Sequence, residues 1–256
     1  MVFRIFRISI FAYVICILAA IWLHPKLIYP FGDATFDRPG YTSIISDGAH
    51  LYVSDLPEAD DTVLFFMGNG GALIYFQPIF AAHEQAGRRV VALQYPDGGG
   101  VDGPVSEDIL KAQALTSYDW TADQGWGDIV VHGYSMGTSL AQFVASKREV
   151  AALILDAPFM RMCELMARRA WMPACHLPYV QKWDSAAYAK DIQAPILIQH
   201  GAQDVLIPAN DSARLAEAMR AKGRIVTYNL FKDADHNTLP SAPDYRSEIS
   251  KFLASQ

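Results

Sequence analysis

Apolar residues along most of the chain form short runs that are separated by amphipathic stretches. Runs of Val, Ile, Leu and Phe with few polar interruptions are typical of strands that are buried on both faces of a sheet. Between these runs, apolar positions recur every three or four residues, which is typical of helices that cover a sheet. The predicted strands lie within residues 61–71, 88–96, 128–132, 150–156, 195–200 and 224–231, and the predicted helices are residues 75–86, 105–117, 138–147, 211–222 and 242–254.

A different pattern precedes the first of these strands. Residues 41–56 (YTSIISDGAHLYVSDL) contain two short strand-like segments around Asp47-Gly48, a dipeptide that favours a tight hairpin turn. The pattern therefore predicts an α/β fold with a mostly parallel sheet, helices on both faces and an antiparallel hairpin at the start. In such sheets, functional sites form outside the carboxyl ends of the strands.

The amino terminus is an apolar segment that follows two arginines. As a helix, the uncharged residues 8–23 span about 24 Å, slightly less than a hydrocarbon core of roughly 30 Å. Snorkelling arginines can make up the difference. We expect an uncleaved membrane anchor in residues 1–28 and a folded domain in residues 29–256, and the arginines favour an extracytoplasmic domain. A cleaved signal peptide, for which no convincing cleavage site is present, and a buried core helix are the alternatives.

Composition narrows the class of protein further. The chain has 256 residues, of which 52% are hydrophobic and 19% charged, and this suits one domain with a sizeable core. Its net charge of −6, with scattered basic residues, predicts no nucleic-acid partner. No Cys/His spacing is typical of a zinc site, so neither a metal nor an organic cofactor is expected. Cys163 and Cys175 form a disulfide if the domain is exported, or remain two buried thiols; the sequence leaves both open.

The pentapeptide Gly133-Tyr134-Ser135-Met136-Gly137 has the form G-x-S-x-G and joins a predicted strand to a predicted helix. In this context a strained turn presents the serine as a nucleophile, and the positions two before and two after it need to be nearly without side chain. An ordinary glycine-rich turn is the alternative.

A nucleophilic serine needs a base to take its proton and an acid to orient that base. With a serine in this context, the acid and then the histidine follow it along the chain. Asp204 and His236 follow the last two predicted strands, so both are expected at the same sheet edge as Ser135. We predict these three as the catalytic residues, with Asp156 at another strand end as the competing acid.

The other histidines are expected to have surface or packing roles. His132 and His200, at strand ends, are expected to be structural, and a place in the lining of the site is the alternative. For the oxyanion hole, we predict the backbone amides of Met136 and Asn69, because Asn69 lies in the glycine-rich segment FFMGNGG after the first parallel strand. A flexible loop without a donor role is the alternative. Residues 98–103 (GGGVDG) fit G-x-G-x-x-G, but their place after the second parallel strand argues against dinucleotide binding.

Taken together, these segments resemble the α/β-hydrolase superfamily and, within it, the Bem46-like serine hydrolases. The similar segments are HPKLIYP, FFMGNGG, GPVSE, GYSMG, DAPF, HGAQDVLIP and ADHN. The resemblance implies a three-layer sandwich, a membrane anchor and a triad of Ser135, Asp204 and His236. This chain has QYPDGGG where the family has an Asp-Tyr-Arg-Gly-Tyr-Gly-like run, and Met67 where a histidine is common. Both departures lie near the mouth of the site, so no substrate preference is carried over.

Residues 157–194 form an insertion at the place where such enzymes carry a lid. It contains four of the eight methionines, Met160, Met162, Met166 and Met172. Flexible thioethers suit an adaptable cleft for a hydrophobic acyl group, whereas packing of the lid onto the core is the alternative.

The sequence thus predicts a membrane-anchored serine hydrolase that cleaves a hydrophobic acyl ester or thioester through an acyl-enzyme intermediate. A peptidase or aminopeptidase on the same triad and a catalytically inactive binding scaffold are the alternatives. The expected partners are a small-molecule acyl substrate and the membrane, and the oligomeric state is not predicted.

Overall fold

The computed structural model describes residues 2–170 and 173–256, so Met172 of the insertion lies outside the described residues. Its sheet has the strand order β1-β2-β4-β3-β5-β6-β7-β8. The pairs β1–β2 and β2–β4 are antiparallel and the other pairs are parallel. The strands are β1 (Tyr41–Ser46), β2 (Ala49–Ser54), β3 (Asp61–Phe66), β4 (Arg88–Gln94), β5 (Ile129–Tyr134), β6 (Ala152–Asp156), β7 (Ile196–Gly201) and β8 (Val226–Phe231). This arrangement confirms the predicted fold class.

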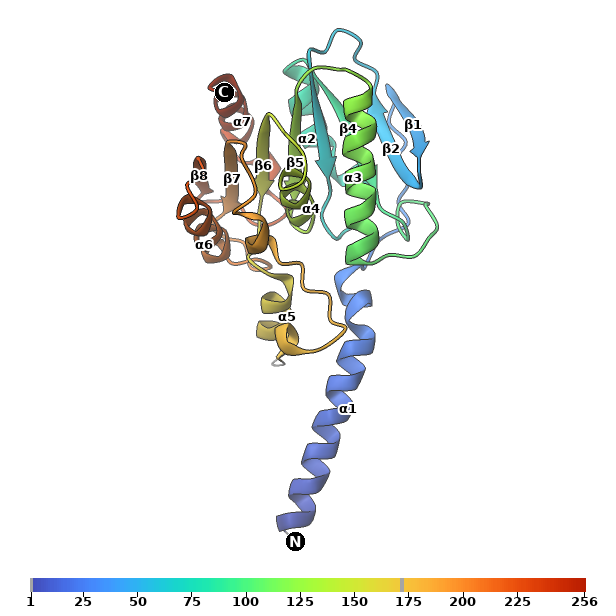
Figure 1. The fold of residues 1–256 in the computed structure, drawn as a ribbon, viewed down its shortest axis with the longest axis vertical. Helices are drawn as coiled ribbons and strands as arrows, with labels where there is room; N and C mark the ends of the chain where they lie inside the picture. The colour runs from blue at the N-terminus through green and yellow to red at the C-terminus, as the bar shows by residue number, and fades with distance from the viewer. Residues whose placement is uncertain (1, 171–172) are drawn as a thin grey trace.

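Helices cover both faces of this sheet. In Figure 1, α3 lies in front of the strands and α2 lies behind them. β5, β6 and β7 are buried at every position, as their apolar sequences predict. The helices of the domain core are α2 (Gln77–Gln85), α3 (Glu107–Asp123), α4 (Gly137–Ala145), α6 (Ala209–Arg220) and α7 (Tyr245–Ala254).

The hairpin turn has the conformation that its dipeptide favours. Asp47 and Gly48 have φ angles of 42° and 81°, and two successive positive φ angles match the twist of paired strands. Ser46 pairs with Ala49 directly across the turn. The predicted antiparallel start of the sheet is confirmed.

The amino-terminal helix α1 (Val2–Ile28) projects from the body of the domain, and its first half has no neighbour (Figure 1). Within residues 2–170 and 173–256, α1 is the helix that is long and apolar enough to cross a membrane. A signal sequence would have the same features.

In the described part of the insertion, residues 157–170 and 173–194, there is one α-helix, α5 (Met162–Ala170), and there are two short 3₁₀ turns, η2 (Ala174–His176) and η3 (Ser185–Tyr188). Of the two alternatives for the cysteines, the structure has the disulfide, which joins Cys163 in α5 to Cys175 in η2. Phe159 and Trp183 are fully buried, so these aromatic side chains pack onto the core and do not line an open cleft.

A polar junction connects the end of α1, the start of α3 and the end of the insertion; it consists of His24, Tyr29, Glu107 and Gln181. The Gln181 amide donates to His24 Nε2 at 3.2 Å. Its side-chain Oε1 accepts hydrogen bonds from the Tyr29 hydroxyl and, at 2.6 Å, from the Glu107 amide. The Glu107 carboxylate also accepts from backbone amides of the insertion, those of residues 182 and 183. The insertion is therefore held against α1.

Candidate active site

The turn at Ser135 has the strained conformation that the G-x-S-x-G pattern predicts. β5 ends at Tyr134 and α4 begins at Gly137. Between them Ser135 has a φ of 52°, which is uncommon for a residue with a side chain. The Ser135 amide donates to the Asp156 carbonyl at 2.8 Å. This bond fixes the turn at the carboxyl edge of the sheet.

The two glycines of the pentapeptide allow close packing of three elements. A Cβ added at Gly133 would lie 2.4 Å from the carbonyl oxygen of Gly137, and one at Gly137 would lie 2.0 Å from that of Phe66 at the end of β3. Real Cβ atoms do not approach backbone oxygens this closely. The glycines are therefore required where α4 starts against β3 and β5.

Ser135, His236 and Asp204 form a continuous hydrogen-bonded chain. The Ser135 hydroxyl donates to His236 Nε2 at 3.0 Å, and His236 Nδ1 donates to Asp204 Oδ2 at 2.6 Å. The three residues follow β5, β8 and β7, and their exposed fractions are 7%, 9% and 7%. The structure thus brings together the three side chains that the sequence singles out.

Asp204 has a full set of hydrogen-bond donors. Its Oδ1 accepts from the amides of Leu206 and Ile207, both at 2.8 Å. Its Oδ2 lies 3.1 Å from His200 Nε2, in addition to the bond from His236. Burial by itself would raise the pKa of Asp204, but the bonds from the two histidines and from the Ile207 amide hold this pKa well below its ordinary value. Asp204 is therefore a carboxylate that can stabilise a positive charge on His236.

The loops that carry Asp204 and His236 are packed against each other. The Gln203 amide donates to the Ala234 carbonyl at 2.9 Å, and a Cβ at Gly201 would lie 2.4 Å from that same oxygen. The Tyr134 hydroxyl, next to the serine, donates to the His236 carbonyl. These contacts set the distance between acid, base and nucleophile.

The predicted oxyanion amides belong to two segments that meet at Ser135. A Cβ at Gly68 would lie 3.2 Å from the Ser135 Cβ, so the loop after β3 lies directly beside the serine. Within the described residues, the amides of Met136 and Asn69 donate no hydrogen bond to another backbone group. Both are therefore available to an external acceptor.

Neighbouring residues hold the loop after β3 in place. The Tyr95 hydroxyl donates to the carbonyl of the buried Met67 at 2.7 Å. The Gln94 side chain donates to the carbonyls of Gly71 and Gly98, each at 3.0 Å. The glycine-rich segment 98–103, weighed above as a dinucleotide motif, thus packs behind the predicted oxyanion loop.

Asp156, the competing acid, belongs to a separate buried network. Its Oδ2 accepts from His132 Nε2 at 2.8 Å and from the Tyr245 hydroxyl, and its Oδ1 accepts from Gln199 Nε2 at 3.2 Å. None of these bonds reaches His236, so the structure favours Asp204 as the residue that orients the histidine.

Two contacts of histidines other than His236 were not predicted from the sequence. His83 from α2 joins the buried network through a 3.0 Å contact with His132, and burial together with the neighbouring His132 lowers its pKa well below the ordinary value. His200, expected to be structural, contacts the Asp204 carboxylate directly. The spacing His200-Gly-Ala-Gln-Asp204 after a strand is the signal that points to this second contact.

Residues 100–249, more than half of the chain, match the model of the dienelactone hydrolase family. The chain belongs to this family. The segment of this chain that matches the dienelactone hydrolase model contains Ser135, Asp204 and His236. An uncharacterized protein of Mycobacterium tuberculosis is 31% identical over 198 residues, which cover 75% of this chain and 69% of that protein.

Two further comparisons give another relative and the fold. Protein Bem46 of Schizosaccharomyces pombe is 24% identical over 224 residues, covering 81% of this chain and 72% of that protein. The structure of the Pyrococcus furiosus esterase Pf2001 superposes with a TM-score of 0.73 and 18% identity, covering 88% of this chain and 96% of that one. The protein is an α/β-hydrolase, and the resemblance to Bem46-like proteins is confirmed.

Proposed function

We propose that this protein is a membrane-anchored serine hydrolase that cleaves esters or thioesters of hydrophobic acyl groups. The observation that carries the proposal is the hydrogen-bonded chain from the Ser135 hydroxyl through His236 to Asp204. A serine hydroxyl becomes a useful nucleophile when a neighbouring base can take its proton. In this chain, His236 is the base and Asp204 keeps its ring in the required orientation.

The first half of the reaction forms an acyl-enzyme. His236 Nε2 takes the Ser135 proton while the serine Oγ forms a bond to the substrate carbonyl carbon. The negative charge that develops on the carbonyl oxygen is held by the amides of Met136 and Asn69. His236 then gives the proton to the leaving alkoxide or thiolate as the bond from the carbonyl carbon to the leaving group breaks.

The second half releases the acid. His236 takes a proton from a water molecule, whose oxygen bonds to the acyl carbon. The bond to Ser135 then breaks, and the serine oxygen regains its proton from His236. The net reaction adds one water across the ester or thioester and leaves the enzyme unchanged. Each step uses side chains and amides of this chain alone.

Apolar side chains near the site support an acyl substrate. Val205, directly after Asp204, is 85% exposed, and Leu206 and Tyr75 are also exposed. Tyr75 follows the predicted oxyanion loop, so these side chains come from two loops at the carboxyl edge of the sheet. Exposed apolar side chains on these two segments favour contact with an apolar ligand.

For the division of the chain, we propose that residues 1–28 anchor the protein in a membrane and residues 29–256 form the hydrolase domain, with a lid at about residues 157–194. The long exposed α1 supports the anchor. The Cys163–Cys175 disulfide supports an extracytoplasmic domain, because disulfides persist mainly in oxidising compartments. Arginines before the apolar segment support the same orientation.

The Ser135→Ala variant tests the proposed nucleophile. It should fold normally and lose about 10⁴-fold or more in kcat on an activated acyl ester, because no other group can form the acyl-enzyme. It should also lose covalent labelling by a fluorophosphonate probe. Circular dichroism and probe labelling in detergent micelles measure both, with Ser146→Ala at the half-buried carboxyl end of α4 as the matched control. Labelling that persists in Ser135→Ala would contradict the proposal.

A panel of acyl esters, acyl thioesters and aminoacyl amides of graded chain length separates the remaining possibilities. Preference for longer acyl esters or thioesters is the expected result. Preference for the amides would favour a peptidase on the same residues. Folded wild-type protein that neither turns over any substrate nor reacts with the probe would favour a binding scaffold.

A further inference from the structure

The part of the insertion that contains the disulfide rests on α1; we call its described residues, 163–170 and 173–180, the disulfide loop. Its buried residues Cys163, Ala174 and Val180 pack against Ala20 and Ile21 of α1. These contacts lie well before the end of the helix at residue 28. The disulfide loop therefore extends along the side of α1 towards the amino terminus, as Figure 1 shows for the end of α5.

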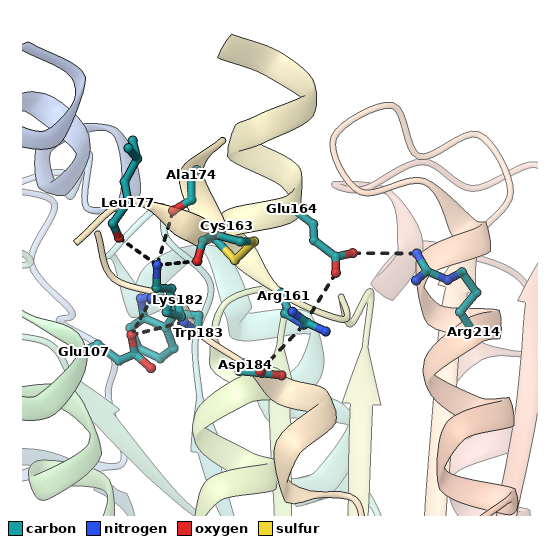
Figure 2. Close-up of a disulfide and its surroundings, with 11 residues drawn as sticks. Glu107, Arg161, Cys163, Glu164, Ala174, Leu177, Lys182, Trp183, Asp184 and Arg214 are labelled. Carbon is teal, nitrogen blue, oxygen red and sulfur yellow. Dashed lines mark hydrogen bonds and ion pairs between the residues drawn. A yellow bond between two sulfur atoms is a disulfide. The ribbon is translucent and has the colours of Figure 1, made fainter. Parts of the chain in front are cut away.

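Several polar contacts fix the disulfide loop in this position. Lys182 donates from Nζ to the carbonyls of Ala174, Cys175 and Leu177, at 3.3, 2.6 and 2.8 Å. Figure 2 shows this ammonium group between the carbonyl oxygens and close to the disulfide. The polar junction holds the following residues against α1 through His24. The position of the loop along α1 is thus determined by the fold.

The position of this contact along α1 determines how deep the contact would lie in a membrane. The uncharged part of α1, residues 8–25 between Arg7 and Lys26, spans about 27 Å as a helix. A hydrocarbon core is roughly 30 Å thick, so a transmembrane α1 that is centred on this uncharged stretch fills the core with it. Ala20 and Ile21 then lie inside the boundary of the hydrocarbon core. The side chains packed against them lie at that same depth.

The surface of the disulfide loop has the composition of a membrane–water boundary. Tyr179 is 89% exposed and has a φ of 63°, a left-handed conformation that is rare for an aromatic residue. The basic side chains Arg169 and His176 are exposed on the same loop, whereas Arg168 is paired with Asp211 of α6. Tyrosine rings and basic side chains are enriched at the level of lipid headgroups.

The carboxyl edge of the sheet faces the same side. The chain leaves α1 and reaches the predicted oxyanion loop within a few residues. The Gly32 amide donates to the Gly70 carbonyl at 3.4 Å, and a Cβ at Gly71 would lie 2.5 Å from the Phe31 ring. The loop beside Ser135 is therefore anchored directly to the end of α1.

We propose that the disulfide loop is a membrane-contacting element that inserts its exposed face, with Tyr179, into the headgroup region beside α1. The active-site edge then faces the bilayer, and acyl substrates enter from the lipid phase. The partner of this surface is the lipid bilayer that holds α1. This inference rests on the proposed anchor and goes beyond it, because an anchored domain could equally stand away from the membrane.

Environment-sensitive fluorophores on single thiols test this inference in the full-length protein. The native chain is labelled on Cys16, which the disulfide leaves as the remaining cysteine. Tyr179→Cys and Glu58→Cys, each with Cys16→Ala, report on the disulfide loop and on an exposed turn at the opposite end of the sheet. Pro178→Cys is a second position in the disulfide loop in case Tyr179→Cys does not fold. The proteins are labelled in detergent and reconstituted into phosphatidylcholine–phosphatidylglycerol vesicles.

Lipids with a spin label at the top of the acyl chain should quench the fluorophore at position 179 or 178 several-fold more strongly than the one at position 58, and its emission should be blue-shifted. Lipids spin-labelled deep in the acyl chain should quench the fluorophore on Cys16. Equal, water-like behaviour at positions 179 and 58 with a quenched Cys16 would overturn the inference while leaving the anchor intact. An unquenched Cys16 would overturn both the anchor and the inference.

Discussion

At the scale of single residues, Asp204 interacts with two histidines that have different positions relative to the serine. His236 lies between Asp204 and Ser135, whereas His200 contacts only the acid and the Ile207 carbonyl, at 2.9 Å. With His200 Nε2 as the donor, His200 can hold the carboxylate in place without taking the serine proton. The hydrogen-bonded contact of Ser135, His236 and Asp204 could be predicted from their places after strands. The contact of His200 with Asp204 could not be predicted, because it depends on the conformation of the loop after β7.

Asp204→Asn should lower kcat by about 10⁴-fold, because an amide cannot stabilise the protonated His236 as a carboxylate does. The pKa of Asp204 is well below its ordinary value in the folded protein. Its contribution to stability is therefore fully present above an unfolded-state pKa of about 3.9 and is lost as the pH falls towards the folded-state value.

Unfolding by urea in detergent, followed by tryptophan fluorescence, should give a constant stability difference between wild type and Asp204→Asn from neutral pH down to about pH 5. The difference should shrink below about pH 4. A difference that has already disappeared at pH 5 would show that the carboxylate is not held in its charged form.

At the scale of elements, helix and strand types follow the apolar pattern, but their lengths depend on tertiary contacts. Residues 105–117 are predicted as a helix, whereas α3 runs to Asp123. Ser, Thr and Asp in the second half compete with the backbone for hydrogen bonds and so weaken a local helix prediction. In the fold, Ser117 and Thr121 are buried and donate to the carbonyls four residues earlier, at 2.6 and 2.7 Å.

Gly137→Ala should disrupt the turn at the nucleophile, because the added methyl group would lie 2.0 Å from the Phe66 carbonyl oxygen. The backbone on both sides is buried, so we expect a loss of about 2 kcal/mol or more in stability and little remaining probe labelling at Ser135. Gly32→Ala is the control, since its nearest neighbour would be 3.9 Å away. Thermal unfolding of both variants gives the comparison, and equal stability would contradict the packing argument.

At the scale of the whole molecule, the fold class follows from the order of elements, while the disulfide and the contacts of the insertion do not. Two cysteines twelve residues apart are compatible with free thiols or a disulfide, and only the packing of α5 against η2 brings them together. Methionines in the insertion suggested a cleft, yet Met160, Met162 and Met166 are half-buried and pack against the core. The apolar pattern of a segment does not reveal which neighbour covers it.

The disulfide provides a test of membrane orientation in cells. If the domain is extracytoplasmic, alkylation of denatured protein without reductant should modify Cys16 alone, and prior reduction should add Cys163 and Cys175. Mass spectrometry of the tryptic peptides counts the modified thiols. A Cys163→Ala/Cys175→Ala variant is the control for the reduced sample. Modification of all three thiols without reductant would place the domain in a reducing compartment.

The polar junction makes α1 and the hydrolase fold hard to separate. A water-soluble fragment that starts at residue 29 would retain Ser135, His236 and Asp204. It would lack the His24 ring that accepts the Gln181 hydrogen bond, and the surface of Ala20 and Ile21 on which the disulfide loop packs. Kinetic measurements on such a fragment would therefore describe a hydrolase whose insertion has lost its supporting neighbour.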